Sequence, residues 1–319
     1  MLNYLKEEIE KIEEALQTEK LSTHPFINQV SEYLLFAGGK RVRPLLMVLS
    51  AKLFSSENFN HDLYRTSLLF EYLHTATLLH DDVVDNAEFR RGRKAARNLW
   101  GNQATILVGD YLYAKSLKIA SALKNPEVME VITRTTLLMS EGEVMQLLNL
   151  DNQELSEKEY EEVIFRKTAI LISAACEVGA IIGGATHAQR ESLKNYGFYL
   201  GMAFQVIDDL LDYLSTETGK DLGKDFAEGK ITLPVIYALE TIPPEEKEQL
   251  KKLFKKENPS REDFEKAFRI IQKAKGFERA KKKAEEYVKA AKECLSGLPE
   301  SPSREALIFL ADYLLERKK

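Results

Sequence analysis

Two short stretches of this 319-residue chain decide the expected fold: residues 79–85 read LHDDVVD, and residues 206–212 read VIDDLLD. Both lie in longer segments, 61–86 and 187–214, whose apolar residues recur with the period of an α-helix, and strand-like alternation is hard to find. Gly and Pro clusters separate such segments, so we expect about a dozen helices and no linker that divides domains. The sequence predicts an all-α fold in a single domain, residues 1–319.

Each stretch contains the pattern Asp-Asp-x-x-Asp, which brings three carboxylates within about one helical turn. Such carboxylates repel one another, and two such patterns are expected by chance in well under about 1% of chains of this length. Helix caps or surface acidic patches are the ordinary alternative, but apolar residues surround both triplets. Oxygen ligands without a nearby His and Cys set favour Mg²⁺ over zinc, so we expect two helix faces that hold divalent ions and, through them, a diphosphate. The expected ligands are Asp81, Asp82, Asp85, Asp208, Asp209 and Asp212.

Basic residues accompany the first triplet. Residues 38–44 read GGKRVRP and place three cations beside a flexible Gly-Gly start of a helix, where amides and guanidinium groups favour phosphate. Residues 90–93 read RRGR and follow the triplet by about one helical turn. A solvated basic turn is the alternative interpretation of either segment. Further phosphate contacts could come from Lys167, Lys220, Lys224 and Lys230, although a surface lysine is the simpler interpretation of each one alone.

Other features bound the rest of the chain. Ser156 and Glu159 form a capping box, which predicts a helix that runs to the Gly183-Gly184 pair with Lys167 inside it. Residues 245–319 are rich in Lys and Glu and are expected to form peripheral amphipathic helices. Residues 316–319 could close over the mouth of the site or fray, and fraying is the favoured interpretation.

Composition argues against several classes of protein. The net charge of −5 gives no general attraction to nucleic acid or to an anionic membrane. No run approaches the ~18 apolar residues of a membrane span, and the N-terminus lacks a signal-peptide core. Cys176 and Cys294 show no metal-ligand spacing, so we expect reduced thiols in a cytoplasmic protein.

These motifs resemble those of the trans-isoprenyl diphosphate synthases, or polyprenyl synthetases, and most of all the medium- and long-chain, octaprenyl-type members. The resemblance covers roughly residues 30–240, whereas residues 245–319 resemble the family only in helical character. The matching segments, in chain order, are residues 38–44, 71–92, 166–168, 203–205, 208–212, 219–225 and 228–230.

The resemblance implies an isoprenoid synthase-type helical bundle around a deep central cavity, usually homodimeric, and it implies a role for each matching residue. Isopentenyl diphosphate would be bound by Lys40, Arg43, His74 and Arg91. The allylic diphosphate would be bound by Arg90, Lys167, Lys220 and Lys230, and Thr168 and Gln205 would line the reacting centre. The six aspartates would hold Mg²⁺, with about three ions when substrate is bound. His74 also fits independently, because it precedes Asp81 by two helical turns on nearly the same face.

The chemistry explains these residue types. A diphosphate leaves an allylic carbon and generates a carbocation, and metal ions and cations stabilise the charge that grows on the leaving group. The double bond of isopentenyl diphosphate attacks the cation, and we expect a proton then to be lost to the released diphosphate. Water must be excluded because it would quench the cation.

Product length should depend on the helix that precedes Asp81, through Leu73, Ala76 and Thr77. Ala76 is small and Thr77 is modest, so a tunnel along this helix should stay open, and the resemblance implies a product of about C30 to C50 for quinone side chains. The alternatives are a short-chain (farnesyl or geranylgeranyl) diphosphate synthase and a non-catalytic partner subunit of a heteromeric synthase. Terpene cyclases, head-to-head synthases and helical scaffolds fit the two complete triplets and the GGKR segment less well.

Overall fold

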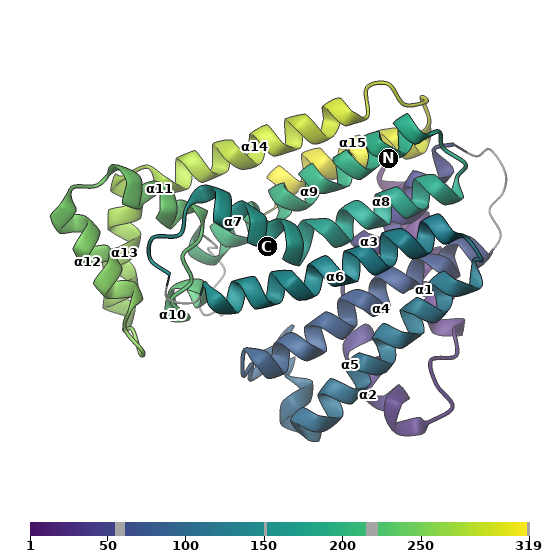
Figure 1. Cartoon of the computed structure of the whole chain (residues 1–319), viewed down its shortest axis with the longest axis horizontal. Helices are drawn as coiled ribbons and strands as arrows, with labels where there is room; N and C mark the ends of the chain where they lie inside the picture. Colours follow the sequence, from purple (N-terminus) through teal and green to yellow (C-terminus); the bar gives the residue numbers. More distant parts are fainter. Residues whose placement is uncertain (55–60, 150–151, 215–222, 318–319) are drawn as a thin grey trace. The chain divides into compact units, whose positions relative to one another are not determined.

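The computed structural model describes residues 1–54, 61–149, 152–214 and 223–317. These residues are almost entirely helical, with one two-stranded hairpin, which confirms the predicted all-α fold (Figure 1). The elements are α1 (Leu2–Thr18), α2 (Pro25–Leu35), α3 (Val42–Lys52), α4 (His61–Val84), β1 (Phe89–Arg90), β2 (Arg93–Lys94), α5 (Ala96–Ala122), α6 (Pro126–Leu148), α7 (Glu157–Ile164), the π-helical segment η1 (Phe165–Ala169), α8 (Ile170–Ile182), α9 (His187–Leu214), α10 (Lys224–Ala227), α11 (Leu233–Thr241), α12 (Pro244–Phe254), α13 (Arg261–Lys273), α14 (Gly276–Cys294) and α15 (Pro302–Leu315).

The chain forms two compact units, each built from three segments. The first unit comprises Met1–Arg134, Ala174–Glu191 and Leu298–Leu307. The second unit comprises Thr135–Ser173, Ser192–Gly297 and Ile308–Lys319. The first aspartate triplet therefore belongs to the first unit and the second triplet to the second unit. None of the described helices combines the length and the apolar character needed to cross a membrane.

Helix α4 is the centre of the first unit and packs against α1, α3 and α5. Its middle is buried on every side: Leu68, Leu69, Phe70 and Tyr72 are all 0% exposed, and the polar Glu71 among them is only 4% exposed. A helix buried all round belongs in a core, and each large apolar side chain contributes about 1.5–3 kcal/mol on burial. The described residues of α4 change from buried to partly exposed near His80, which is where the aspartates begin.

The crossing of α4 and α5 fixes the rotation of the first triplet. His80 Nε2 lies 3.2 Å from both the Ile106 carbonyl oxygen and Asp110 Oδ1. Gly109 makes room for this ring, because a Cβ at that position would lie 2.4 Å from His80 Nε2. With His80 held on α5, the next residue, Asp81, must point to a different side of α4.

The predicted helix from Ser156 to the Gly183-Gly184 pair is confirmed at both ends, and it contains a π-helical segment that the sequence did not predict. The capping box is present, with the Glu159 amide donating to Ser156 Oγ and the Glu159 carboxylate accepting from the Ser156 amide. The α-helix stops at Ile164, however, and η1 interrupts it before α8 resumes. A π-turn inserts a single residue, which shifts a helical pattern by only ~100° and leaves little trace in one sequence.

Candidate active site

The first triplet ends α4, and its three carboxylates differ in exposure. Asp81 is half-buried and Asp85 is exposed, whereas Asp82 is 0% exposed. The turn is intact here, because the Asp85 amide donates to the Asp81 carbonyl oxygen at 2.8 Å. Asp81 and Asp85 therefore share the accessible face that their spacing predicts, and Asp82 turns inward.

Asp82 contacts the first arginine of the β1–β2 hairpin. Arg90 Nε donates to Asp82 Oδ1 at 2.7 Å, and Arg90 Nη2 also lies 2.7 Å from that oxygen. Charge-assisted hydrogen bonds are roughly twice as strong as neutral ones, so this pair ties the hairpin to the end of α4. The roles predicted for both residues, in holding ions and diphosphate, stay predictions.

Arg43, His74 and Arg91 form a cationic cluster in the first unit. Burial, and then the charges of Arg43 and Arg91, hold the pKa of His74 well below its ordinary value, so the imidazole is neutral. Burial and the charge of Arg91 also lower the pKa of Arg43 to about 10. Arg43 Nε is buried, and the described part of the chain offers it no hydrogen-bond partner. A half-buried cation whose buried Nε has an unused donor favours an anionic ligand, and Lys40 lies exposed nearby in sequence.

Arg41, between two of these predicted ligands, has a structural role. It is 3% exposed, and it donates to Glu13 at 2.7 Å, to Glu71 at 2.7 Å and to the Leu35 carbonyl oxygen at 2.6 Å. Its backbone has φ 48° at the start of α3. These contacts anchor the 38–44 segment, so the segment's three cations are not equivalent.

The second triplet ends α9 in the second unit, and again the middle aspartate is buried. Asp208 is 50% exposed, whereas Asp209 is 5% exposed. Tyr160 Oη donates to Asp209 Oδ2 at 2.5 Å, and Gln205 Nε2 donates to Asp209 Oδ1 at 2.8 Å. Asp212 is half-buried. The outer two carboxylates are therefore again the accessible ones.

The second triplet has an acidic neighbour that the sequence did not single out. Asp212 accepts backbone hydrogen bonds from Lys224 at 3.1 Å and from Asp225 at 3.0 Å. Burial, and then the charge of Asp212, raise the pKa of Asp225 to about 7. Burial also raises the pKa of Asp212, and it raises that of Asp209 well above its ordinary value. A bound cation would stabilise the ionised form of these buried carboxylates. The carboxylates of Asp209, Asp212 and Asp225 therefore suit a divalent ion. In the ranges that the structure describes, no three His, Cys, Asp or Glu side chains are placed to hold a metal by themselves.

The π-helical segment η1 carries two of the predicted reacting-centre residues. Lys167 Nζ lies 3.0 Å from Glu143 Oε2, and Thr168 Oγ1 donates to Gln205 Oε1 at 2.8 Å. The structure thus brings Thr168, Gln205 and Asp209 into one connected group, and π-bulges occur frequently at functional sites. Of the remaining predicted lysines, Lys230 Nζ lies 2.5 Å from Glu228 Oε2, and Lys220 lies outside the described residues.

The residues predicted to set product length occupy two sides of α4. Leu73 and Ala76 are 1% and 2% exposed and face the interior of the first unit. Thr77 is half-buried, and its hydroxyl donates to the His74 carbonyl oxygen at 2.8 Å. Thr77 therefore lies near the face that His74 shares with Asp81, Leu73 lies to one side of it, and Ala76 lies on the opposite side of the helix.

The chain end does not behave entirely as predicted. Arg317 Nη2 lies 3.2 Å from Asp208 Oδ1, and its guanidinium carbon is 4.8 Å from the centre of the Phe204 ring. The prediction that residues 316–319 fray is wrong for Arg317, because an ion pair and a cation–π contact hold it. Sequence reasoning could not pair residues so distant along the chain. It also missed Tyr160, although this tyrosine precedes Lys167 by seven residues, as His74 precedes Asp81.

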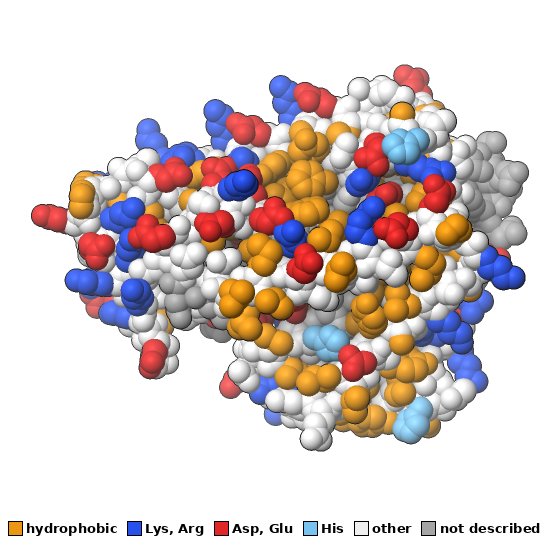
Figure 2. Space-filling model, viewed as in Figure 1, with side chains coloured by type: hydrophobic (Ala, Val, Ile, Leu, Met, Phe, Trp, Pro, Cys, Tyr) orange, Lys and Arg blue, Asp and Glu red, His pale blue; other side chains and the backbone are white. Residues whose placement is uncertain are grey.

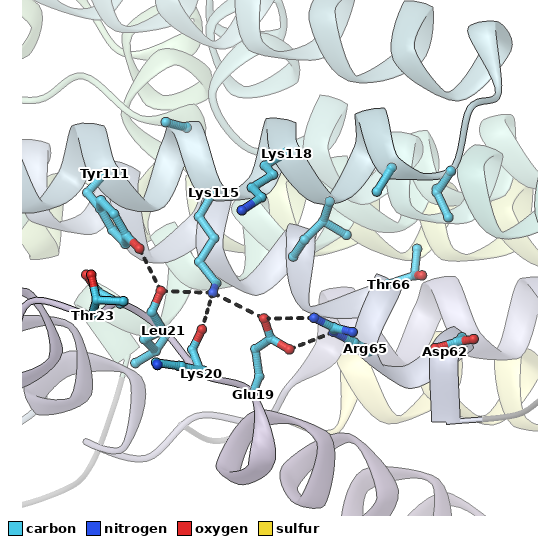
Figure 3. Close-up of a pocket in the computed structure, with 15 residues that line it drawn as sticks. Glu19, Lys20, Leu21, Thr23, Asp62, Arg65, Thr66, Tyr111, Lys115 and Lys118 are labelled. Carbon is cyan, nitrogen blue, oxygen red and sulfur yellow. Dashed lines mark hydrogen bonds and ion pairs between the residues drawn. The ribbon is translucent and has the colours of Figure 1, made fainter.

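A separate pocket of about 800 Å³ lies in the first unit and contains none of the predicted site residues (Figure 3). Glu19 lies 3.1 Å from Lys115 Nζ and 2.6 Å from Arg65 Nε, and Lys115 also donates to the Leu21 carbonyl oxygen at 2.9 Å. These contacts join the segment after α1 to α4 and α5, so the pocket's central charges stabilise the fold.

Known proteins are similar to this chain in sequence and in fold. A model of the polyprenyl synthetase family matches residues 24–271. The chain is 39% identical over 295 residues to octaprenyl diphosphate synthase of Escherichia coli (strain K12), across 92% of this chain and 90% of that protein. It is 35% identical over 318 residues to heptaprenyl diphosphate synthase component 2 of Bacillus subtilis (strain 168), across 99% of this chain and 90% of that protein. A crystal structure of polyprenyl synthase from Caulobacter crescentus CB15, complexed with calcium and isoprenyl diphosphate, superposes with a TM-score of 0.91 at 35% identity, over 100% of this chain and 97% of that one. The chain therefore belongs to the polyprenyl synthetase family, as its motifs predicted.

Proposed function

We propose that this chain is a Mg²⁺-dependent trans-prenyltransferase that condenses isopentenyl diphosphate head to tail with an allylic diphosphate. The observation that carries the proposal is the cluster of Arg43, His74 and Arg91, in the unit that also holds Asp81 and Asp85. The buried Nε of Arg43 has an unused donor, which an anion would satisfy. A diphosphate supplies that anion, and Arg binds phosphate oxygens bidentately.

Each residue then has a task. Arg43, Arg91 and Lys40 bind the diphosphate of isopentenyl diphosphate, and neutral His74 adds a hydrogen bond without further positive charge. Arg90, Lys167 and Lys230 bind the leaving diphosphate, for which they exchange their present carboxylate partners. The accessible aspartates hold Mg²⁺, about three ions with substrate bound, and the bound metal neutralises charge on the leaving group. The ligands with accessible carboxylates are Asp81, Asp85, Asp208 and Asp212.

We propose a product of about C30 to C50, with quinone side chains as the destination. The names of the octaprenyl and heptaprenyl relatives support this range. A small residue at Ala76 and a modest one at Thr77 support it further, because neither would block a growing chain beside Asp81. A short-chain synthase is the alternative that the same chemistry allows.

We further propose a homodimer that forms through α5. Four large apolar side chains of this helix are exposed in the first unit, and hydrophobic side chains gather over α5 in Figure 2. Three of them recur every seven residues, as in a helix that packs against another helix. The four are Leu99, Ile106, Leu107 and Tyr113, which are 46%, 40%, 65% and 38% exposed. The Bacillus subtilis relative is named component 2, so the alternative to a homodimer is that a different subunit covers this face of α5.

Two broader assignments also belong to this proposal. Both units would form one polyprenyl synthetase domain, since the family match at residues 24–271 runs through segments of each. The location would be cytoplasmic, because Cys176 and Cys294 are free thiols and thiols stay reduced in that compartment.

The test is product analysis with protein purified alone. It is incubated with labelled isopentenyl diphosphate, an allylic starter and Mg²⁺, its mass is measured by light scattering, and dephosphorylated products are separated by chromatography. We expect products that end between about C30 and C50, that is about six to ten isoprene units. We expect the particle to contain two chains. A stop at C15 or C20 would refute the proposed length, and no incorporation with dimethylallyl, geranyl or farnesyl starters would favour a partner-dependent subunit.

A further inference from the structure

The buried aspartate of the second triplet is the centre of a hydrogen-bonded chain that links three elements of the second unit. Tyr160 of α7 donates to one carboxylate oxygen of Asp209 at 2.5 Å, and Gln205 of α9 donates to the other at 2.8 Å. Thr168 of η1 donates to the Gln205 amide oxygen at 2.8 Å. Tyr160 is 4% exposed and Asp209 is 5% exposed, so water competes little for these contacts.

The order of donors in this chain is fixed by what each group can do. Gln205 Nε2 donates to Asp209 and Gln205 Oε1 accepts from Thr168, so the two ends of the amide have different partners. The Thr168 hydroxyl then donates to Gln205, and only its lone pairs remain for any other partner. The Tyr160 contact, at 2.5 Å, is short for an O–H···O hydrogen bond. One carboxylate thus sets the orientation of two side chains predicted to line the reacting centre.

The backbone holds these elements together closely. A Cβ at Gly201 would lie 2.5 Å from Ala169 Cα, so α9 lies directly against the end of η1. The rings of Phe165 and Phe198 meet edge to face with centroids 5.4 Å apart, on the same two elements. The network therefore spans a tight contact with little room to adjust, and loss of one hydrogen bond should be felt at its other end.

We propose that Tyr160 is a positioning residue for the prenyl transfer: it fixes Asp209, which through Gln205 orients Thr168 beside Lys167 and sets the direction of the second aspartate triplet. Asp209 acts in this arrangement as the anchor of the triplet, while Asp208 and Asp212 face the ions. This inference deepens the proposed function and rests on it. Tyr160 itself touches neither metal nor substrate.

The test compares Tyr160→Phe with Tyr237→Phe. Both variants keep the ring and remove one hydroxyl that donates to a carboxylate of the second unit, because Tyr237 Oη donates to Glu157 Oε1 at 2.8 Å. Tyr237 is 6% exposed and its partner lies at the start of α7, outside the aspartate triplets, so it is a matched control for lost stability.

For Tyr160→Phe we expect kcat to fall about 10- to 100-fold, from the loss of one short, buried hydrogen bond, with KM for isopentenyl diphosphate within about twofold of the parent value. Calorimetric binding of Mg²⁺ together with inorganic diphosphate should weaken about 3- to 10-fold, which is a readout independent of turnover. Tyr237→Phe should change Tm by a similar amount and leave both quantities near the parent values.

Equal effects of the two variants on kcat and on Mg²⁺ binding would overturn the proposal, since Tyr160 would then act only through stability. A double-mutant cycle with Asp209→Asn decides the matter if Tyr160→Phe is the less stable variant. If Tyr160 acts through Asp209, the double variant is no slower than Asp209→Asn alone, and multiplicative losses contradict that pathway. An inactive parent protein would refute the proposed function, whereas the diphosphate-dependent Mg²⁺ binding would still report on Tyr160.

Discussion

The two aspartate triplets share one sequence pattern and one local geometry, yet they have opposite electrostatic surroundings. In both, the middle aspartate is buried and the outer two are accessible. Asp82 is neutralised by the guanidinium of Arg90, whereas Asp209 receives hydrogen bonds from the neutral groups of Tyr160 and Gln205. The repeated motif therefore determines where the carboxylates point. The side chains that contact the middle aspartate determine how much negative charge remains.

The surroundings extend this contrast. The first unit adds Arg43 and Arg91 and keeps His74 neutral, so it is suited to bind an anion. The second unit adds Asp225, and the pKa values of Asp209 and Asp212 are raised, so it is suited to bind cations. We infer that the second triplet depends more on metal for its charge balance, and that the first depends more on diphosphate.

The largest expected effect comes from removing the metal or its accessible ligands. Chelation by EDTA should abolish turnover, and Asp81→Ala and Asp208→Ala should each lower kcat by at least about 10²- to 10³-fold, because charge on the leaving group loses its compensation. Glu10→Gln, which removes a 64% exposed carboxylate of the first unit, is the control and should stay near the parent rate. Turnover that survives chelation would show that neither aspartate triplet needs a metal ion for activity.

The next effect tests the buried ion pair of the first triplet. Arg90→Gln leaves Asp82 without its guanidinium, so we expect the free energy of unfolding to fall by about 1–3 kcal/mol and kcat/KM for the allylic substrate to fall about 10²-fold. The double variant Arg90→Gln/Asp82→Asn removes both charges and should regain most of the stability but not the activity. Denaturant unfolding and initial rates measure the two quantities, and recovery of both would leave Arg90 no role beyond the fold.

Sequence reasoning found the triplets but not which carboxylate turns inward. The helical period places Asp81 above Asp85 and Asp208 above Asp212, because that relation is local to one helix. The fate of the middle residue depends on a partner from another element, which is Arg90 in one case and Tyr160, 49 residues from Asp209, in the other. The π-segment η1 was missed for a related reason, since one inserted residue barely disturbs periodicity.

A smaller effect should distinguish the triplets by pH. Asp225 has its pKa raised from 3.8 to about 7, so the folded state keeps a proton that the unfolded state releases. Stability is therefore fully present below about pH 4 and is lost as pH rises through about 7. The Tm of the metal-free protein should therefore fall as pH rises from about 5 to about 8. Mg²⁺ should raise Tm more at the higher pH. Scanning calorimetry of Asp225→Asn, which should show a shallower fall, tests the assignment, and an unchanged slope would contradict it.

The smallest effect concerns Arg317, whose guanidinium contacts Asp208 of the second triplet. Arg317 is 19% exposed and Asp208 is 50% exposed, and partly exposed ion pairs contribute only about 0–1 kcal/mol. Because Arg317 Nη2 occupies a position 3.2 Å from Asp208 Oδ1, it competes with an ion for that oxygen. Arg317→Ala should therefore lower the Mg²⁺ concentration for half-maximal activity by about two- to threefold, with Tm changed little. Arg317→Lys, which keeps the charge but not the planar contact with Phe204, should lie between, and a rise in the Mg²⁺ requirement of Arg317→Ala would mean that Arg317 assists the ion instead.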